Sequence, residues 1–144
     1  MENVKERLSI LWIIVMFNMA YADILGLYIP GTLEELAEFA GDIPIAQLML
    51  AGAIIVEIPI IMIILSRVLK YQVNRWTNIF AGALTIFFVI GGGSTNPHYI
   101  FIATIEVVCL SLIIWYAWKW SNPKVEIPES YARSPISEAS EAKL

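Results

Sequence analysis

The segment from Ile45 to Arg67 constrains the fold of this chain more than any other. It holds an apolar run long enough to cross the roughly 30 Å hydrocarbon core of a bilayer as a helix, which takes about 20 residues. A single carboxylate, Glu57, interrupts the run, and Pro59 follows two positions later. An ionised carboxylate near the bilayer centre costs about 2.5 to 3.5 kcal/mol on insertion scales, so Glu57 needs a partner, a proton or a function. The segment therefore predicts a membrane-spanning helix with a polar site.

The composition agrees with a one-domain integral membrane protein. Of the 144 residues 58% are hydrophobic, and the mean hydropathy of +0.70 is too high for an ordinary soluble fold. The net charge of -4 argues against nucleic acid as a partner, because nucleic acid is bound by basic surfaces. The one cysteine, Cys109, excludes the thiol oxidoreductases that need paired cysteines. The glycines 91–93 lack a Walker or dinucleotide pattern around them, so no cofactor is expected.

Three further apolar segments predict an all-α, integral membrane bundle of four transmembrane helices. The spans are expected at about residues 8–28, 45–67, 76–91 and 98–118, within a transmembrane domain over residues 1–120. Residues 121–144, rich in Pro, Ser, Glu and Ala, are predicted to form a flexible polar tail on the cytoplasmic side. The first span has an alternative interpretation as a cleaved signal peptide, because Ala20 and Ala22 follow a basic start and an apolar stretch. Its apolar character continues beyond these alanines, which favours a retained helix.

A short amphipathic helix over residues 32–40 is expected between the first two spans. Thr32 and Glu35 have the spacing of a capping box, which predicts where this helix begins. Its apolar residues recur at three-residue intervals, at Leu33, Leu36 and Phe39. Such a helix lies on the membrane surface with its acidic side in water, either as a connector or as a lid over the bundle.

The basic residues predict the orientation of the bundle. All nine Lys and Arg residues precede the first span, lie between the second and third, or follow the fourth. The positive-inside rule therefore places both termini in the cytoplasm and the two loops without basic residues outside. We expect a multi-pass protein of the inner, or plasma, membrane.

Polar residues at similar depth on three spans form the candidate site. At about 1.5 Å per residue, Asn18, Glu57 and Glu106 lie near the midplane or slightly outside it. The two glutamates are expected to share a proton, because like charges in a low dielectric do not both ionise. Two interpretations stay open: a functional pocket lined by these residues, or interhelical hydrogen bonds that only hold the helices together.

Four more polar residues are assigned to the same ligand-binding or proton-coupling site. Tyr21 lies on the same side of the first span as the asparagine, and Tyr99, seven residues before Glu106, shares the face of that glutamate. Asp23 is shallower on the first span, and His98 lies at the outer mouth. These residues lack the spacing of a metal-ligand set, so no metal site is expected. No catalytic nucleophile is assigned.

Several segments resemble known families. The segment VEIPIIMIILSRVLKYQVNRWTNIFAGALTIFF, a glutamate entering an aliphatic run that ends in Arg, resembles the second and third helices of DoxX-like proteins. With LWIIVMFNMAYADILGLYIPG and NPHYIFIATIEV, the resemblance over residues 7–120 is to an uncharacterised family of small bacterial four-helix membrane proteins, which implies a four-helix bundle. The pieces YADILGLYIP and VEIPII are also similar to the EXPERA-type fold of sterol isomerases and their ligand-binding relatives. That likeness implies a pocket for a hydrophobic or cationic ligand, faced by Asp23 and Glu57.

These features predict a protein that binds or transports a small amphipathic or cationic molecule in an intramembrane polar pocket, with proton coupling through its glutamates. Two other functions stay open. One is a membrane-embedded enzyme that acts on a lipid, sterol or quinone by carboxylate acid/base chemistry. The other is a structural subunit of a membrane complex, formed with further copies of itself or with another membrane protein. For all three functions, we expect the protein to lie in the lipid bilayer.

Overall fold

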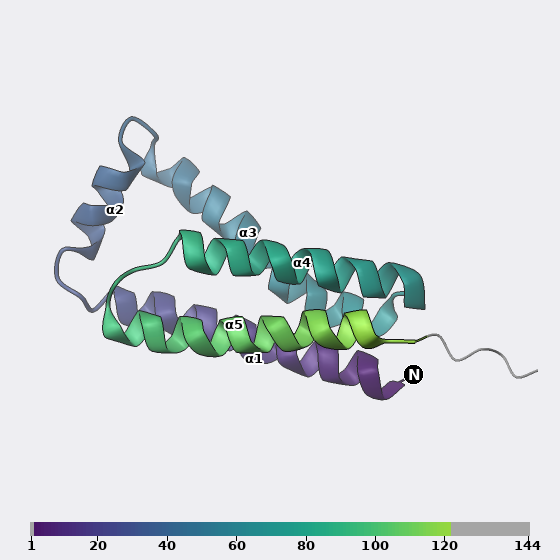
Figure 1. Cartoon of the computed structure of the whole chain (residues 1–144). Helices are drawn as coiled ribbons and strands as arrows, with labels where there is room; N and C mark the ends of the chain where they lie inside the picture. The colour runs from purple at the N-terminus through teal and green to yellow at the C-terminus, as the bar shows by residue number, and fades with distance from the viewer. Residues whose placement is uncertain (1, 122–144) are drawn as a thin grey trace, which may run out of the picture.

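Four long helices run up and down side by side, and a short helix connects the first two of them (Figure 1). The computed structural model describes residues 2–121, so nearly all of the predicted tail lies outside the described residues. The long helices are α1 (Glu2–Gly26), α3 (Ile45–Val68), α4 (Tyr71–Gly91) and α5 (Pro97–Lys119), and the short one is α2 (Thr32–Ala40). Each long helix has the length and apolarity needed to cross a membrane. The predicted fold class, an all-α membrane bundle with four transmembrane helices, is confirmed.

Two of the spans extend further than their apolar stretches predict. α1 begins at Glu2 rather than near residue 8, and α4 begins at Tyr71 rather than near residue 76. The additional turns contain polar and charged residues, so a prediction from hydropathy leaves them out of the span. A helix can still include such residues where it extends beyond the hydrocarbon of the bilayer.

The short helix α2 begins at Thr32 as expected, but no capping box forms. The Thr32 hydroxyl donates to the carbonyl oxygens of Gly26 and Ile29, at 3.0 and 2.9 Å, instead of capping the helix. Gly31 occupies the N-cap position with a φ of 90°. A capping box needs its hydroxyl residue at the N-cap, and Thr32 is already inside the first turn. The left-handed backbone at Gly31 is the turn that redirects the chain here, and glycine adopts it at little cost.

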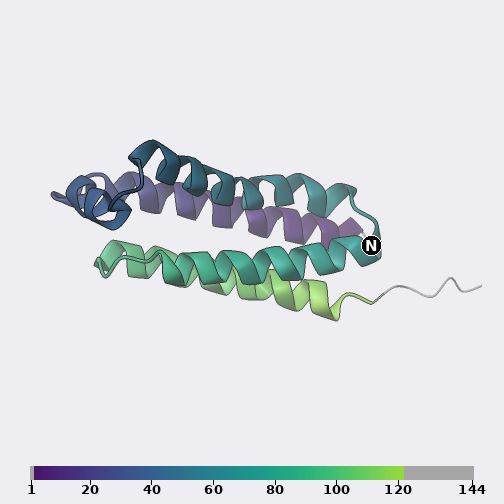
Figure 2. The same ribbon diagram turned by 90° about the horizontal axis from the view of Figure 1, so that it is seen from above.

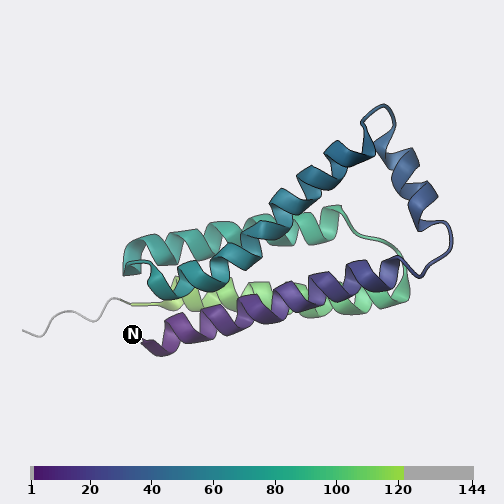
Figure 3. The same cartoon turned by 180° about the vertical axis from the view of Figure 1, so that it is seen from behind.

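The helices form two layers, α1 with α3 and α4 with α5 (Figure 2). α1 and α5 make the main contact between the layers, while α3 packs on α1 and meets α4 less extensively. Toward α2, α3 diverges from the other long helices (Figures 1 and 3). The core consequently lies along α1 and α5.

Large apolar side chains of α1 and α5 fill this core. Leu8, Trp12 and Val15 of α1 and Leu110 and Ile113 of α5 are all fully buried. Residues three or four positions apart share one side of a helix, so a single stripe of each helix enters the contact. α1 is an integral member of the bundle.

The two ends of the bundle differ in charge. The N-terminus, the α3–α4 link and the C-terminal end of α5 lie together at one end, which we call the basic end; the other, with α2 and the α4–α5 loop, is the loop end (Figure 1). The guanidinium carbons of Arg7 and Arg75 lie 5.8 and 5.6 Å from the ring centroids of Tyr116 and Trp118, as cation–π contacts. All six basic residues in the described part belong to the basic end: Lys5, Arg7, Arg67, Lys70, Arg75 and Lys119.

Gly82 allows α4 to approach α5 closely. A Cβ atom at this position would lie 3.0 Å from Cγ1 of Ile114 and 3.8 Å from the carbonyl oxygen of Leu110. Small residues are typical of membrane helix contacts, because packing rather than the hydrophobic effect drives association there.

We expect Gly82→Leu to lower the free energy of unfolding by about 1 to 2 kcal/mol, because the larger side chain forces α4 away from α5. The matched control is Gly52→Leu in α3, since no atom lies within 4 Å of a Cβ atom at that position. Unfolding in mixed micelles of increasing SDS content, followed by far-ultraviolet circular dichroism, measures both variants. Equal losses in the two variants would contradict the proposed role of Gly82.

Candidate functional site

Glu106 is a buried carboxyl in the contact between α5 and the rest of the bundle. The residue is 3% exposed, and its Oε1 has no hydrogen-bond partner in the described part of the chain. Ile102, Leu110 and Ile113 lie on the same buried side of α5, so the helical period carries the carboxyl into the core. A buried polar atom without a partner costs about 1 to 3 kcal/mol, and more when it is charged. An ionisable group of this kind inside a membrane domain is a candidate functional residue.

Asp23 of α1 and Tyr99 of α5 lie near the Glu106 carboxyl. Asp23, an exposed residue in the loop-end part of α1, lies within charge-interaction range of Glu106, and Tyr99 lies seven residues before Glu106 on the same side of α5. The Tyr99 hydroxyl donates to the carbonyl oxygen of Val89 at 2.8 Å, which ties α5 to the end of α4. The structure thus groups three of the predicted site residues, Asp23, Tyr99 and Glu106, which we call the Glu106 cluster.

Glu57 lies away from this cluster, contrary to the expectation from depth alone. The buried residues of α3 are Pro59, Met62 and Ser66, and they define the side of α3 that faces the bundle. At about 100° per residue, Glu57 lies nearly opposite to that side, and it is exposed. α3 also packs on α1 and α4 rather than on α5. The structure therefore does not bring Glu57 and Glu106 to one site.

Three other predicted residues do not link helices. The Asn18 side-chain amide donates to the carbonyl oxygen of Ile14 in its own helix, at 2.9 Å. Tyr21 is 60% exposed on α1, and His98 is half-buried at the start of α5. Within residues 2–121, no group of three His, Cys, Asp or Glu side chains is arranged to hold a metal ion. The structure places these three residues outside the Glu106 cluster.

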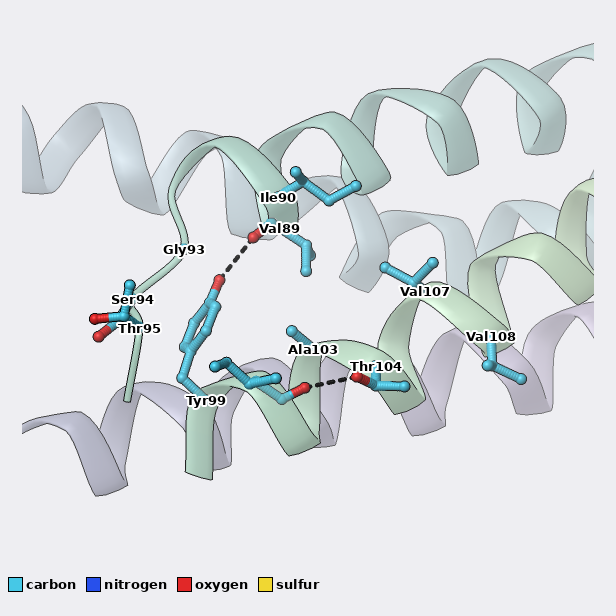
Figure 4. A pocket seen from close by; sticks show the side chains of 11 residues that line it. Val89, Ile90, Gly93, Ser94, Thr95, Tyr99, Ala103, Thr104, Val107 and Val108 are labelled. Atoms are coloured by element: carbon cyan, nitrogen blue, oxygen red, sulfur yellow. Dashed lines mark hydrogen bonds between the residues drawn. The ribbon is translucent and has the colours of Figure 1, made fainter. Parts of the chain in front are cut away.

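A groove of about 560 Å³ opens between the loop end of α4 and the first turns of α5 (Figure 4). Its size falls within the range of about 300 to 1,000 Å³ that is typical of small-molecule sites. Tyr99 belongs to both the groove and the Glu106 cluster, and Ala103 and Val107 lie three residues before and one after Glu106. Its lining is mostly aliphatic, with the polar Ser94, Thr95 and Tyr99 at its mouth near the α4–α5 loop and Thr104 further along α5.

Gly93 allows close packing at the end of the groove next to the α4–α5 loop. A Cβ atom here would lie 3.1 Å from Cε1 of Tyr99 and 3.3 Å from the carbonyl oxygens of Val89 and Ile90. The tyrosine ring therefore rests against the α4–α5 loop because position 93 has no side chain. The turn at Gly93 is thus closely packed.

A buried hydrogen-bond network at the basic end is absent from the sequence-based prediction. The Asn78 side-chain oxygen accepts from Nε1 of Trp12 at 2.8 Å and from the Ser66 hydroxyl at 3.1 Å. The Asn78 amide nitrogen donates to Oδ1 of Asn74 at 2.6 Å, and Nδ2 of Asn74 donates to the Ser66 carbonyl oxygen at 2.7 Å. All four side chains are fully buried. The two asparagines, four residues apart on an apolar helix, were the available signal for this network.

Further hydrogen bonds at the basic end join α1 to α3 and to the α3–α4 link. The Ser9 hydroxyl accepts from Nε of Arg67 at 3.0 Å and donates to the carbonyl oxygen of Ile63 at 2.9 Å. Lys5 donates from Nζ to the carbonyl oxygen of Leu69 at 2.8 Å. Together, the hydrogen bonds at the basic end join α1, α3 and α4. The asparagine side chains in this network are paired, whereas Oε1 of Glu106 is not. Interhelical hydrogen bonding therefore occurs here among residues outside the predicted site.

The fold and these polar residues define a four-helix integral membrane protein with one buried carboxyl whose Oε1 is unpaired among the described residues. The chain belongs to a family of unknown function, DUF6326, whose profile matches residues 1–126. This family assignment agrees with the expected small uncharacterised family, whereas the comparisons support neither the DoxX-like nor the EXPERA-type resemblance. No match to the chain was found among curated proteins or among solved structures.

Proposed function

We propose that this protein binds a small amphipathic cation within the loop-end half of its membrane domain, with Glu106 as the counter-charge. The observation that carries the proposal is the buried Oε1 of Glu106 without a hydrogen-bond partner in the described chain. In a low dielectric such a carboxyl, without a hydrogen-bond donor, is stabilised by a proton or by a cation at close range.

The charge distribution supports a cation from outside the chain. Every Lys and Arg in the described part belongs to the basic end, whereas Glu106 and Asp23 lie in the middle and loop-end parts of their helices. Two carboxyls near each other with no basic residue at that end make a site of net negative character. A proton and an organic cation then compete for Glu106, which gives a physical basis for proton coupling.

The groove between α4 and α5 supports an amphipathic rather than a fully polar ligand. Its aliphatic lining suits an apolar body, and the hydroxyls at its mouth suit a polar group at the membrane surface. Tyr99 connects the groove to the Glu106 cluster. On the orientation that the basic residues predict, the mouth faces the outside of the cell.

The test uses the lipophilic cation tetraphenylphosphonium and the full-length protein in lipid nanodiscs, with empty nanodiscs subtracted. We expect binding by the wild-type protein, and at least tenfold weaker binding by Glu106→Gln, because the amide provides no counter-charge. Binding should also weaken as the pH falls, since protons then occupy the carboxyl. Tetraphenylborate, an anion of the same shape, should not bind.

Glu57→Gln is the matched control, because it makes the same chemical change on the exposed side of α3. It should bind the cation as the wild type does. Equal affinity of the wild type and Glu106→Gln would refute the proposal, and so would equal retention of the cation and the anion.

A further inference from the structure

α3 carries an apolar side that no other helix of the described chain covers. Only 11% of its most apolar stretch is buried, against 33% in each of the other three spans. The uncovered side is opposite to the buried Pro59, Met62 and Ser66. Its apolar members are between 48% and 73% exposed. We call this side the α3 stripe, and it consists of Leu50, Ile54, Glu57, Ile61, Ile64 and Val68.

The spacing of the stripe is that of a helix–helix contact. Its members alternate at intervals of four and three residues, which is the a/d repeat of a left-handed coiled coil. Left-handed crossings near +20° are also the commonest geometry between membrane helices. The stripe continues over nearly the whole of α3, so a partner helix can follow it across the membrane.

The chemistry of Glu57 selects the partner. Glu57 lies midway along α3, at the depth where a lone carboxylate costs about 2.5 to 3.5 kcal/mol and lipid tails offer no hydrogen bond. A second copy of the chain, inserted in the same direction, presents its own Glu57 at the same depth. A two-fold axis normal to the membrane brings the two side chains together. Because a carboxylic acid both donates and accepts, two glutamates that share a proton satisfy each other.

We propose that the α3 stripe is the interface of a homodimer in which the Glu57 side chains of two copies are hydrogen-bonded at the centre. The apolar members of the stripe pack around this pair, and the pair fixes the register of the two helices. A polar residue at one a or d position is a known device for setting register and partner number. The interface leaves the Glu106 cluster and the groove free, because α1, α4 and α5 take no part in it.

The first test is disulfide cross-linking in native membranes, in a Cys109→Ala background. Single cysteines are placed on the stripe, Ile54→Cys and Ile61→Cys, and at a control position of another span that is at least as exposed, Phe80→Cys in α4. We expect at least a fivefold larger cross-linked fraction from the two stripe positions than from the control, at twice the mass of one chain. Cross-linking no greater than at Phe80, or a product with a different membrane protein, would overturn the proposal.

The second test changes the charge at the centre of the interface in the Ile61→Cys chain. Glu57→Gln should keep the cross-link, because two amides still pair, whereas Glu57→Lys should reduce it at least fivefold through like-charge repulsion. Coexpression of tagged Glu57→Lys and wild-type Glu57 chains should restore a mixed dimer, since an ammonium group then meets a carboxylate. Unchanged cross-linking in Glu57→Lys, with no preference for the mixed pair, would contradict the Glu57 contact.

These outcomes are separate from those of cation binding. The Glu106→Gln variant should cross-link through Ile61→Cys as the wild type does. Loss of cation binding with intact cross-linking, or the reverse, therefore assigns a failure to one proposal and leaves the other standing.

Discussion

The Asn78→Leu variant is expected to lose about 2 to 4 kcal/mol of unfolding free energy. Leucine fills a similar volume but leaves three partners without a bond: the indole nitrogen of Trp12, the Ser66 hydroxyl and Oδ1 of Asn74. Each buried group left unpaired costs about 1 to 3 kcal/mol, and some of this is recovered by local rearrangement. The network joins three helices, so its loss weakens the basic end of the whole bundle.

Asn18→Leu is the matched control for this prediction. It makes the same change in a membrane helix, but Asn18 bonds only to its own helix and should shift the stability by less than about 0.5 kcal/mol. Cys109 is buried and is the one cysteine of the chain, so labelling with a thiol-reactive fluorophore during heating or SDS titration reports unfolding. A loss no larger in Asn78→Leu than in Asn18→Leu would show that the network is not needed for stability.

The Glu106→Leu variant is expected to change stability in the opposite direction, with a gain of about 1 to 3 kcal/mol. The substitution removes a buried carboxyl oxygen that has no hydrogen-bond partner in the described chain and replaces it with an apolar group of similar size. A functional residue that lowers stability is a common compromise in natural proteins. The variant should at the same time lose cation binding, as Glu106→Gln does.

Glu106→Gln serves as the comparison variant. It removes the charge but keeps a buried polar group, so its stability should lie between those of the wild type and Glu106→Leu. Far-ultraviolet circular dichroism during SDS titration is the appropriate measurement, because Cys109 is three residues from Glu106 and its labelling could respond to the substitution itself. Destabilisation of Glu106→Leu by more than about 1 kcal/mol would mean that the carboxyl contributes a structural bond.

The predicted order of helices along the chain agrees with the structure. The four apolar segments became α1, α3, α4 and α5, and the short amphipathic segment became α2. Span length follows from the thickness of the bilayer, and the basic residues of the described part lie at one end because Lys and Arg stay out of the hydrocarbon and on one side of the membrane. These properties can be read from the order of residues without knowledge of any contact.

The order of residues does not show toward which side of its helix each polar side chain points. Glu57 and Glu106 are at similar depths, yet Glu57 is exposed and Glu106 is buried. In a soluble helix the polar side marks the surface, but in a membrane both the lipid-facing and the core-facing sides are apolar. The sequence of a span consequently gives depth at about 1.5 Å per residue but not rotation about the helix axis.

Sequence alone therefore determined the class of this protein, its four spans and the positions of its carboxyls along them. Only the tertiary structure decided that Asp23, Tyr99 and Glu106 form one cluster, that Asn74 and Asn78 enter a paired network, and that Glu57 stands on an uncovered side. The reason is physical: rotation of each helix is set by close packing with its neighbours, such as the approach of α4 to α5 at Gly82.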